Sequence, residues 1–376
     1  QVQVYSAPGR AELGGNHTDH QHGYGLAAAV TLDLVAVAAR NTDGYVRVKS
    51  RGFNKLDVID LTVAGPQEGE GTHSASLIRG IAEGFRAVGK TVGGFDAYTA
   101  SDVLRGSGLS SSAAFEMGMA VIWNGEYDCG LTPTELAKIC QYAENTYFGK
   151  PSGLLDQLTS AVGGIIFADF ADPASPQIEK IHTDGLLPLG MSLCVTDTRG
   201  SHSELTSEFA AIRKEMEQVA GTLGKKVLGQ VTESEFWAAL PELRRKCGDR
   251  AVLRAIHYFE ENARTLAQRD ALQAGRFAAF AALVLESGRA SFALCQNVYC
   301  STDVRHQGLS VALALSQCIL QGSGAWRMQG GGFAGTIQAY VPRDLLERYH
   351  SEIERVFGAG SCYVLRLREQ GAVRVG

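Results

Sequence analysis

The sequence predicts an α+β protein of two domains. In the first half of the chain, short strand-like runs alternate with helical runs, whereas long helical stretches dominate the second half. Glycine-rich turns occur in both halves. The chain has 376 residues, of which 45% are hydrophobic, and this is enough for more than one buried core. We expect an N-terminal domain over residues 1–175 and a C-terminal domain over 176–376, divided near a turn-rich segment at 172–176.

The first half is expected to start with strands. Residues 1–6 and 30–38 are predicted to be strands, the second because apolar residues alternate along it. Residues 76–88 carry apolar side chains at helical spacing and stop at Gly89, so they predict a helix. The remaining predictions are an extended segment over 95–104, helices over 112–125 and 132–147, and a strand over 162–170.

The second half is expected to be mainly helical. A strand over 191–197 opens it, and two long helical stretches over 203–221 and 232–285 follow. Residues 330–341 read as a glycine turn that leads into a strand. No internal repeat or low-complexity tract interrupts this pattern.

Charge and cysteine content narrow the class of protein. The net charge of −5 gives no indication of binding to nucleic acid or to an anionic membrane. The longest apolar stretch, residues 26–39, contains Asp33 and is too short to cross a bilayer, and no signal-peptide pattern opens the chain. None of the eight cysteines forms a CxxC pair, which favours the reducing cytoplasm. We therefore expect a cytoplasmic monomer whose partners are small molecules.

A glycine- and serine-rich stretch is the strongest motif in the chain. It lies between the extended segment over 95–104 and the predicted helix over 112–125. Glycines let the backbone pass close to an anion, and a helix that starts just after them directs free N–H groups and its positive dipole end at that anion. An ordinary turn that caps a core helix would give the same pattern. The phosphate-binding hypothesis assigns the nucleotide phosphates to Gly106, Gly108, Leu109, Ser110, Ser111, Ser112 and Ala113.

Two other motifs match patterns of other kinds of site. Residues 84–91 match the string GxxxxGK[ST], but here a helix runs into Gly89 and a strand follows, whereas a phosphate-binding P-loop needs the opposite order. Residues 17–22 are dense in metal-ligand types, which leaves a metallohydrolase as a rival class. A polar pocket for a substrate with many hydroxyl groups would use the same residues.

Three charged residues are candidates for chemistry. Arg10 follows the first strand beside a glycine turn, which suits a phosphate clamp as well as a structural ion pair. Glu144 and Asp156 form the best pair of carboxylates, one to hold Mg²⁺ and one to orient or deprotonate an attacking hydroxyl. Each of the three residue types is also common on solvated protein surfaces.

Four motifs in this order resemble those of the galactokinase family of GHMP kinases. The segment 8–19, PGRAELGGNHTD, is similar to the family's PGRVNLIGEHTD, and GLSSSAA at 108–114 resembles its phosphate loop. The segment GLLDQ at 153–157 resembles the end of the family's CGIMDQ, and RMQGGGFAG at 327–335 resembles its RMTGGGFGG. The match runs over nearly the whole chain and implies a ribosomal-S5-like N-terminal domain and a ferredoxin-like C-terminal domain.

The resemblance also implies an activity and roles for individual residues. It implies phosphoryl transfer from MgATP to the anomeric hydroxyl of galactose or a similar sugar. Arg10 would stabilise the transferring phosphate, and Asp156 would be the catalytic base or orienting carboxylate. Ser112 and Glu144 would hold Mg²⁺. The sugar would be bound by Asn16, His17, Asp19, Gly153 and Phe209. Two of these residues, Asn16 and Phe209, depart from the family pattern.

The two departures concern the sugar. Asn16 stands where the family has a glutamate, and Phe209 stands where it has a tyrosine. A glutamate facing C6 would repel a carboxylate there and an asparagine would not, so a kinase for galacturonate or another C6-modified sugar is an alternative. A sugar sensor with weakened catalysis is an alternative of another class, although Arg10, Asp156 and the intact phosphate loop count against it.

Overall fold

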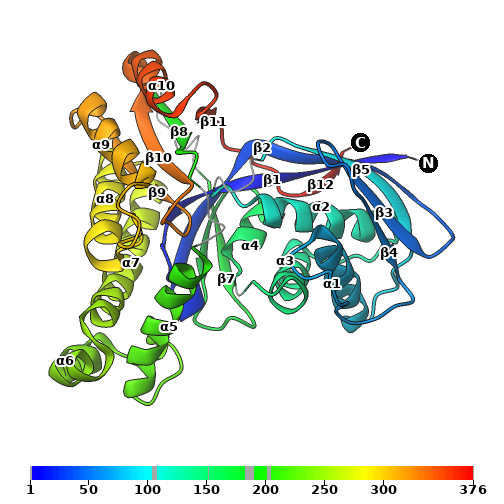
Figure 1. Ribbon diagram of the computed structural model, residues 1–376, viewed down its shortest axis with the longest axis horizontal. Coiled ribbons are helices and arrows are strands. Elements are labelled where there is room, and N and C mark those ends of the chain that lie inside the picture. Colours follow the sequence, from blue (N-terminus) through cyan, green and yellow to red (C-terminus); the bar gives the residue numbers. More distant parts are fainter. Residues whose placement is uncertain (1, 104–107, 151, 183–189, 201–204, 376) are drawn as a thin grey trace.

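The computed structural model describes residues 2–103, 108–150, 152–182, 190–200 and 205–375. Two sheets organise this part of the chain, a larger one with helices on one face and a smaller one against which helices of the second half pack (Figure 1). The strands of the larger sheet are β1 (Gln3–Gly14), β2 (Tyr24–Arg40), β3 (Tyr45–Ser50), β4 (Leu56–Asp60), β5 (Phe95–Ser101), β6 (Ile165–Asp169), β7 (Gln177–Ile181) and β12 (Val373–Val375).

The larger sheet is ordered β12-β1-β2-β5-β3-β4, and β6 pairs with both β2 and β7. All of its pairings are antiparallel except that of β3 with β5. Strand β2 has 17 residues, so it pairs with β1 along its length, with β5 near one end and with β6 near the other. The three sets of pairings make β1 and β2 the centre of the sheet.

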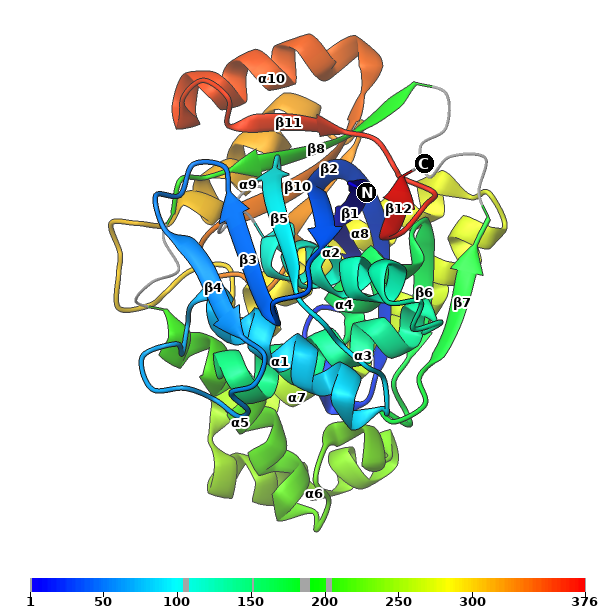
Figure 2. The ribbon, with the colours of Figure 1, turned by 90° about the vertical axis from the view of Figure 1, so that its right-hand side faces the viewer.

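Four helices cover one face of the larger sheet (Figure 2). Buried aromatic side chains from a strand and two helices meet there, with the rings of Phe95 and Trp123 4.9 Å apart and those of Phe85 and Trp123 6.1 Å apart. Such buried contacts contribute most of the stability of helices of this length. The four helices are α1 (Ser74–Ala87), α2 (Ser111–Glu126), α3 (Pro133–Ala143) and α4 (Leu155–Val162).

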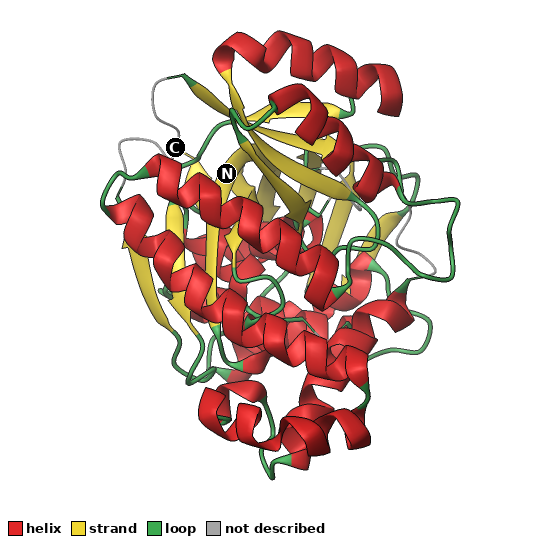
Figure 3. Cartoon of the chain, turned by 90° about the vertical axis from the view of Figure 1, so that its left-hand side faces the viewer, coloured by secondary structure: helices red, strands yellow, loops and turns green. Residues whose placement is uncertain are grey.

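The smaller sheet is antiparallel, with the order β11-β8-β10-β9. Helices of the second half of the chain pack against it (Figure 3). The strands are β8 (Met191–Asp197), β9 (Ala325–Gln329), β10 (Thr336–Pro342) and β11 (Cys362–Leu365). The helices of this half are α5 (Thr206–Thr222), α6 (Glu233–Cys247), α7 (Asp249–Gln273), α8 (Phe277–Ala290), α9 (Gly308–Leu320) and α10 (Arg343–Phe357).

The α+β class predicted from the sequence is confirmed, but several boundaries were wrong. The helical stretch expected over 232–285 is three helices, because Gly248 and Gly275 have φ angles of +86° and +64°, which a helix cannot contain. The first strand extends from Gln3 to Gly14, well past the expected end at residue 6. A change of register beside Pro8 lets the strand continue although proline cannot donate a backbone hydrogen bond.

Strand pairing crosses the predicted domain boundary between residues 175 and 176. Strands β7 and β12 both lie after this boundary, yet both belong to the larger sheet. The two termini consequently lie close together, since β12 pairs with β1 at Val4 and Val375 (Figure 1). The boundary at 175 stays a prediction.

One helical segment among the described residues, Phe277–Cys295, is long and apolar enough to cross a membrane by length and composition alone. It comprises α8 and a following π-helical turn, and α8 packs against α7 and β9. A core helix of a soluble protein passes the same test, so this segment is weak support for a membrane span.

Candidate active site

The phosphate loop of the sequence prediction joins β5 to α2. Gly108 has a φ of +68°, and a Cβ there would lie 2.9 Å from Thr336 Oγ1, so the position has no room for a side chain. Ser110 is also left-handed, with a φ of +57°, and α2 begins directly after it at Ser111. The backbone thus turns sharply into a helix N-terminus, the geometry expected of an anion site. Gly106 lies outside the described residues.

Arg10 and Asp156 are brought together although 146 residues separate them. Arg10 Nε donates to Asp156 Oδ1 at 2.7 Å, and Arg10 Nη1 donates to the Gly108 carbonyl. Ser110 Oγ donates to the second oxygen, Asp156 Oδ2. Asp156 stands in the first turn of α4, where the helix dipole favours a negative charge. One carboxylate therefore links β1, the phosphate loop and α4.

The surroundings keep Asp156 ionised. Burial by itself would raise its pKa, but the charge of Arg10 and the hydrogen bonds from Ser110 and Arg10 outweigh burial and lower the pKa. A carboxylate with a lowered pKa is seldom protonated at neutral pH and is a good hydrogen-bond acceptor. It is suited to orienting a hydroxyl group and to receiving its proton late in a reaction.

Glu144 is buried at the start of a π-helical turn that follows α3, and its two oxygens have four partners. Oε1 lies 3.1 Å from Ser112 Oγ and 2.8 Å from Lys150 Nζ. Oε2 accepts from Ser152 Oγ and, at 3.0 Å, from Gln157 Nε2. The pairing of Ser112 with Glu144 that was predicted from the sequence is therefore present, with an ammonium group beside it.

A second buried carboxylate lies behind Glu144. Gln157 Nε2 is also 3.0 Å from Glu116 Oε2, so one amide bridges the two carboxylates. Burial and the charge of Glu144 raise the pKa of Glu116 well above its usual range. This shift favours the protonated form of Glu116, which limits the negative charge beside Glu144.

Asp19 and Gly153 adjoin each other close to Asp156. A Cβ on Gly153 would overlap the carboxylate of Asp19, so only glycine fits there. Asp19 Oδ1 accepts from the His20 backbone N–H at 2.7 Å. Burial and, after it, the nearby charge of Asp156 raise the pKa of Asp19 to about 6.

His17 belongs to a chain of hydrogen bonds that fixes its tautomer. Its Nε2 lies 3.0 Å from the Gly331 carbonyl, which only accepts, so Nε2 carries the proton. Its Nδ1 then accepts from His20 Nε2 at 3.3 Å, and His20 Nδ1 accepts from Gln21 Nε2 at 3.1 Å. Burial lowers the pKa of His17 to about 4, so both contacts are made by a neutral ring.

The two departures from the family pattern have different surroundings. Asn16 is 1% exposed, and its amide bonds to Glu12, Gly330 and Asn297, so all of its described partners are protein atoms. Phe209, on α5, packs edge-on against Phe333 with ring centroids 5.4 Å apart. A Cβ on Gly331 would lie 2.6 Å from the Phe209 ring. The ring thus covers the glycine turn that His17 contacts.

The rival motifs do not form sites in the described structure. Among the described residues no group of three or more His, Cys, Asp or Glu side chains could hold a metal ion, so the histidine-rich segment 17–22 gives no zinc site. Gly89 ends α1 with a φ of +76° and β5 follows, which confirms that residues 84–91 are not a P-loop.

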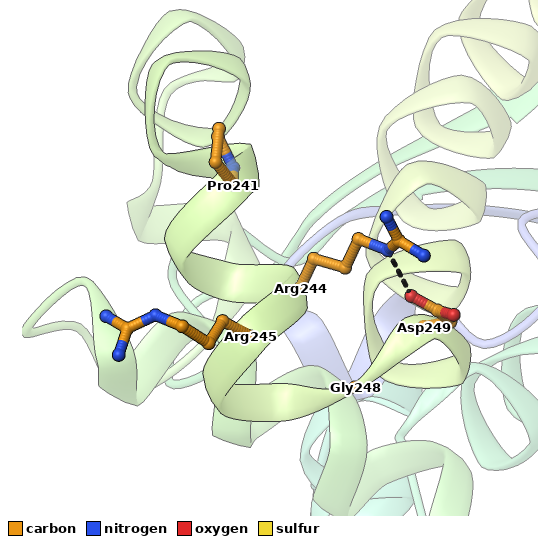
Figure 4. Close-up of a pocket in the computed structure, with 5 residues that line it drawn as sticks. All are labelled: Pro241, Arg244, Arg245, Gly248 and Asp249. Atoms are coloured by element: carbon orange, nitrogen blue, oxygen red, sulfur yellow. Dashed lines mark hydrogen bonds and ion pairs between the residues drawn. The ribbon is translucent and has the colours of Figure 1, made fainter.

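A hollow elsewhere on the surface is unrelated to these residues. It lies where α6 meets α7 and is lined by Pro241, Arg244, Arg245, Gly248 and Asp249 (Figure 4). The ion pair of Arg244 with Asp249, 2.6 Å long, is its main polar contact, and both side chains are well exposed. An exposed ion pair of this kind is common on protein surfaces and indicates no chemistry.

Sequence reasoning missed several side chains that complete the site. Lys150, Ser152 and Gln157 surround Glu144, and they lie within the segment that carried the motif. Their place in that segment was the available signal. Asn297 contacts Asn16 across 281 residues, and nothing in the local sequence marks it.

Comparisons with known proteins agree with this arrangement. The family model "GHMP kinases N terminal domain" matches residues 76–164, and the "Galactokinase galactose-binding signature" matches residues 1–40. A galactokinase of Streptomyces coelicolor is 32% identical over 371 residues, which is 97% of this chain and 91% of that protein.

Solved structures share the fold. The crystal structure of Lactococcus lactis galactokinase complexed with galactose has a TM-score of 0.86 at 24% identity and covers all of this chain and 95% of that one. A crystal structure of mevalonate kinase has a TM-score of 0.67 at 14% identity, over 98% of this chain and 99% of that one.

Proposed function

The chain belongs to the galactokinase family of GHMP kinases and is a sugar kinase, and from this premise we propose how it phosphorylates its substrate. The reaction is transfer of the γ-phosphoryl group of ATP to the anomeric hydroxyl of galactose, which yields ADP and the sugar 1-phosphate. The observation that carries the assignment of residues is the position of Asp156, held by Arg10 and by the phosphate loop together.

Asp156 and Arg10 supply the chemistry that this chain contributes to the transfer. The ionised Asp156 accepts a hydrogen bond from the anomeric hydroxyl, orients its oxygen for attack and takes its proton as the new P–O bond forms. Arg10, fixed by the Gly108 carbonyl and by Asp156, offers the rest of its guanidinium to the negative charge that spreads over the phosphate oxygens. The N–H groups at the start of α2 bind the phosphates of ATP.

Ser112 and Glu144 would hold Mg²⁺ with the nucleotide. Their oxygens are 3.1 Å apart, both are hard donors, and the ammonium of Lys150 at Glu144 Oε1 shows that this oxygen attracts a cation. The donor set therefore fits the ion. An Mg²⁺ ion held there would neutralise part of the charge of the nucleotide phosphates.

The sugar lies between Asp156 and the segment that carries His17 and Asp19. Asp19 accepts hydrogen bonds from sugar hydroxyls, and Gly153, which has no side chain, leaves room for the Asp19 carboxylate. Phe209 closes the apolar side of the pocket against the glycine turn. The amide of Asn16 is bonded to Glu12, Gly330 and Asn297, so it gives no preference for an acidic sugar over galactose.

An assay of ADP formation with MgATP and a panel of sugars tests the proposal. Galactose should give ADP and a sugar phosphorylated at C1, identified by phosphorus NMR, whereas galacturonate should give much less. A folded protein that binds galactose without forming ADP would instead be a sugar sensor. Turnover of galacturonate above that of galactose would overturn the assignment of substrate.

We also propose that the protein acts as a monomer in the cytoplasm. The compartment is the one in which eight unpaired thiols are stable, and all eight cysteines are free in the structure. Gel filtration of the purified protein measures the oligomeric state, and an elution volume equal to that of a dimer would contradict this proposal.

A further inference from the structure

Glu12 carries a buried carboxylate that the phosphoryl-transfer scheme does not use. It lies on β1, two residues after Arg10, and is 8% exposed. Its Oε1 accepts from Arg327 Nη2 at 2.7 Å and from Asn16 Nδ2 at 3.0 Å. Arg327, on β9, is fully buried, so Glu12 joins the central strand of the larger sheet to an edge strand of the smaller one.

Arg327 depends on Glu12 for its counter-charge. The second carboxylate nearby, that of Glu261, is 3.9 Å from Arg327 Nη1, and its oxygens accept hydrogen bonds from Ser287 and Arg264. Removal of one partner from a buried ion pair leaves the other charge uncompensated, which is far more costly than the loss of an exposed pair. Glu12 is therefore the closest counter-charge of the Arg327 guanidinium, whose Nε and Nη1 also donate to the carbonyls of Met328 and Leu13.

Asn16 connects this ion pair to the sugar end of the site. Its Nδ2 has two hydrogens, and both are used, one by Glu12 and one by the Gly330 carbonyl at 2.8 Å. Its Oδ1 accepts from Asn297 Nδ2 at 2.9 Å, and the same Nδ2 lies 3.1 Å from the Gly331 carbonyl.

The Gly331 carbonyl also accepts a hydrogen bond from His17 Nε2. The carboxylate of Glu12 is thus linked to the imidazole of His17 through the amide groups of Asn16 and Asn297 and the Gly331 carbonyl. A shift of that carboxylate would be passed to His17 by way of Asn16 and the glycine turn.

The residue types at positions 12 and 16 are exchanged relative to the motif that the segment resembles. PGRVNLIGEHTD has an amide at the position of Glu12 and a carboxylate at the position of Asn16. Both arrangements supply one carboxylate and one amide next to the arginine of the third motif. Two carboxylates would repel each other, and two amides would leave Arg327 without its closest counter-charge.

We propose that Glu12 is a positioning residue for the sugar, which acts as one unit with Asn16 and Arg327. The inference rests on the proposed function and adds a residue that the motif comparison does not assign. Glu12 holds Arg327 and fixes the amide of Asn16, and that amide in turn fixes the glycine turn against which His17 is oriented. The pair at positions 12 and 16 works when it contains one carboxylate and one amide, in either order.

Exchange of the two residues tests this unit. Glu12→Asn and Asn16→Glu each leave a buried group without its partner, so each should raise the KM and Kd for galactose about tenfold and leave the KM for ATP within about twofold. In the double variant the carboxylate at position 16 replaces the one that Arg327 loses. Both constants should then return to within about threefold of the wild-type values. The Kd is measured by titration calorimetry without nucleotide and the KM by ADP release.

A second ion pair, whose arginine is buried, provides the control for loss of stability alone. Arg79 is 5% exposed and pairs with Glu70 at 2.8 Å, and the pair lies on α1 and the loop before it, outside the proposed site. Glu70→Gln should lower the melting temperature while the KM for galactose stays unchanged. Should the single variants at position 12 or 16 unfold, Glu12→Gln keeps the acceptor for Asn16 and should give an intermediate KM.

Two results would overturn the proposal. The first is a double variant as impaired as the two single effects multiplied together, which would mean that the residues do not act as a unit. The second is a set of variants that melt earlier but keep the wild-type KM and Kd for galactose, which would make Glu12 purely structural. Wild-type protein that binds galactose without turnover refutes the proposed function instead, and the Kd values then still decide the role of Glu12.

Discussion

The proposed phosphate end and sugar end of the site differ in the kind of contacts that their side chains make. Arg10, Asp156 and Glu144 make the phosphate end a network of ion pairs, all from the first half of the chain. At the sugar end a neutral His17 contacts the Gly331 carbonyl from the second half. Charge close to the reacting phosphate can stabilise a transition state, whereas neutral donors and acceptors at fixed positions select one arrangement of hydroxyl groups.

This difference predicts which kinetic constant a substitution at each end should change. Loss of a charged group at the phosphate end removes stabilisation that exists mainly in the transition state, so it should lower kcat. Loss of a neutral contact at the sugar end removes binding that the ground state shares, so it should raise the KM for sugar and leave kcat nearly unchanged.

Replacement of Arg10 should have the largest effect. Arg10→Ala removes the guanidinium that we propose to face the transferring phosphate and also releases Asp156 from its ion pair. We expect kcat to fall by ~10² or more, because phosphoryl transfer depends mainly on positioning and charge. Steady-state ADP release at saturating galactose and MgATP measures it. A variant with near-wild-type kcat would remove Arg10 from the mechanism.

Asp156→Asn should have the next largest effect on kcat. The amide keeps the shape of the side chain and can still receive a hydrogen bond, but it cannot take the proton of the anomeric hydroxyl. A fall in kcat of ~10² is the scale of a lost general base. Binding of ATP, followed by calorimetry, should change little and serves as the control for folding. A change confined to the KM for galactose would make Asp156 a binding group only.

The phosphate end was also the part that the sequence predicted best. Its residues sit in short motifs whose types have a direct chemical meaning, such as the glycines before α2 and the carboxylate at Asp156. The contacts of Asn16 could not be predicted, because Gly330 and Asn297 reach it across about 300 residues. Local patterns carry no information on such pairings, which depend on how the two sheets meet.

The fold shows the same limit. The helices predicted over 76–88 and 112–125 were close to α1 and α2, since periodic apolar residues mark a helix locally. Strand β12, with three residues, was missed, because its partner β1 lies at the other end of the chain. The long helix expected over 232–285 failed at its two glycines, whose positive φ angles could not be read from a single sequence.

Glu144→Ala tests the metal assignment at the phosphate end with a smaller expected effect. The substitution removes an oxygen ligand from an ion that demands near-octahedral coordination, so the Mg²⁺ concentration for half-maximal rate should rise about tenfold. Lys150→Met is the matched control, because it removes the cation that competes for the same oxygen. It should lower the Mg²⁺ requirement or leave it unchanged. An unaltered Mg²⁺ titration in Glu144→Ala would mean that other groups hold the metal.

The smallest effect concerns pH at the sugar end. The pKa of Asp19 is raised to about 6, chiefly by burial, and in the proposed site Asp19 would accept sugar hydroxyls best when ionised. The ionised fraction falls as the pH falls through 6, so galactose should bind about fourfold more weakly half a pH unit below that pKa than at pH 8. His17, with a pKa of about 4, and Asp156, with a lowered pKa, do not change charge in this range.

The measurement of this last effect is the Kd for galactose by calorimetry without nucleotide, which avoids the titration of the ATP phosphates. Asp19→Asn should bind galactose more weakly at every pH and show no change between pH 5 and 8, because the amide has no proton to gain. Wild-type affinity that stays constant over this range would mean that Asp19 is either ionised throughout or not in contact with the sugar. Equal pH dependence in both proteins would assign the titration to a group other than Asp19.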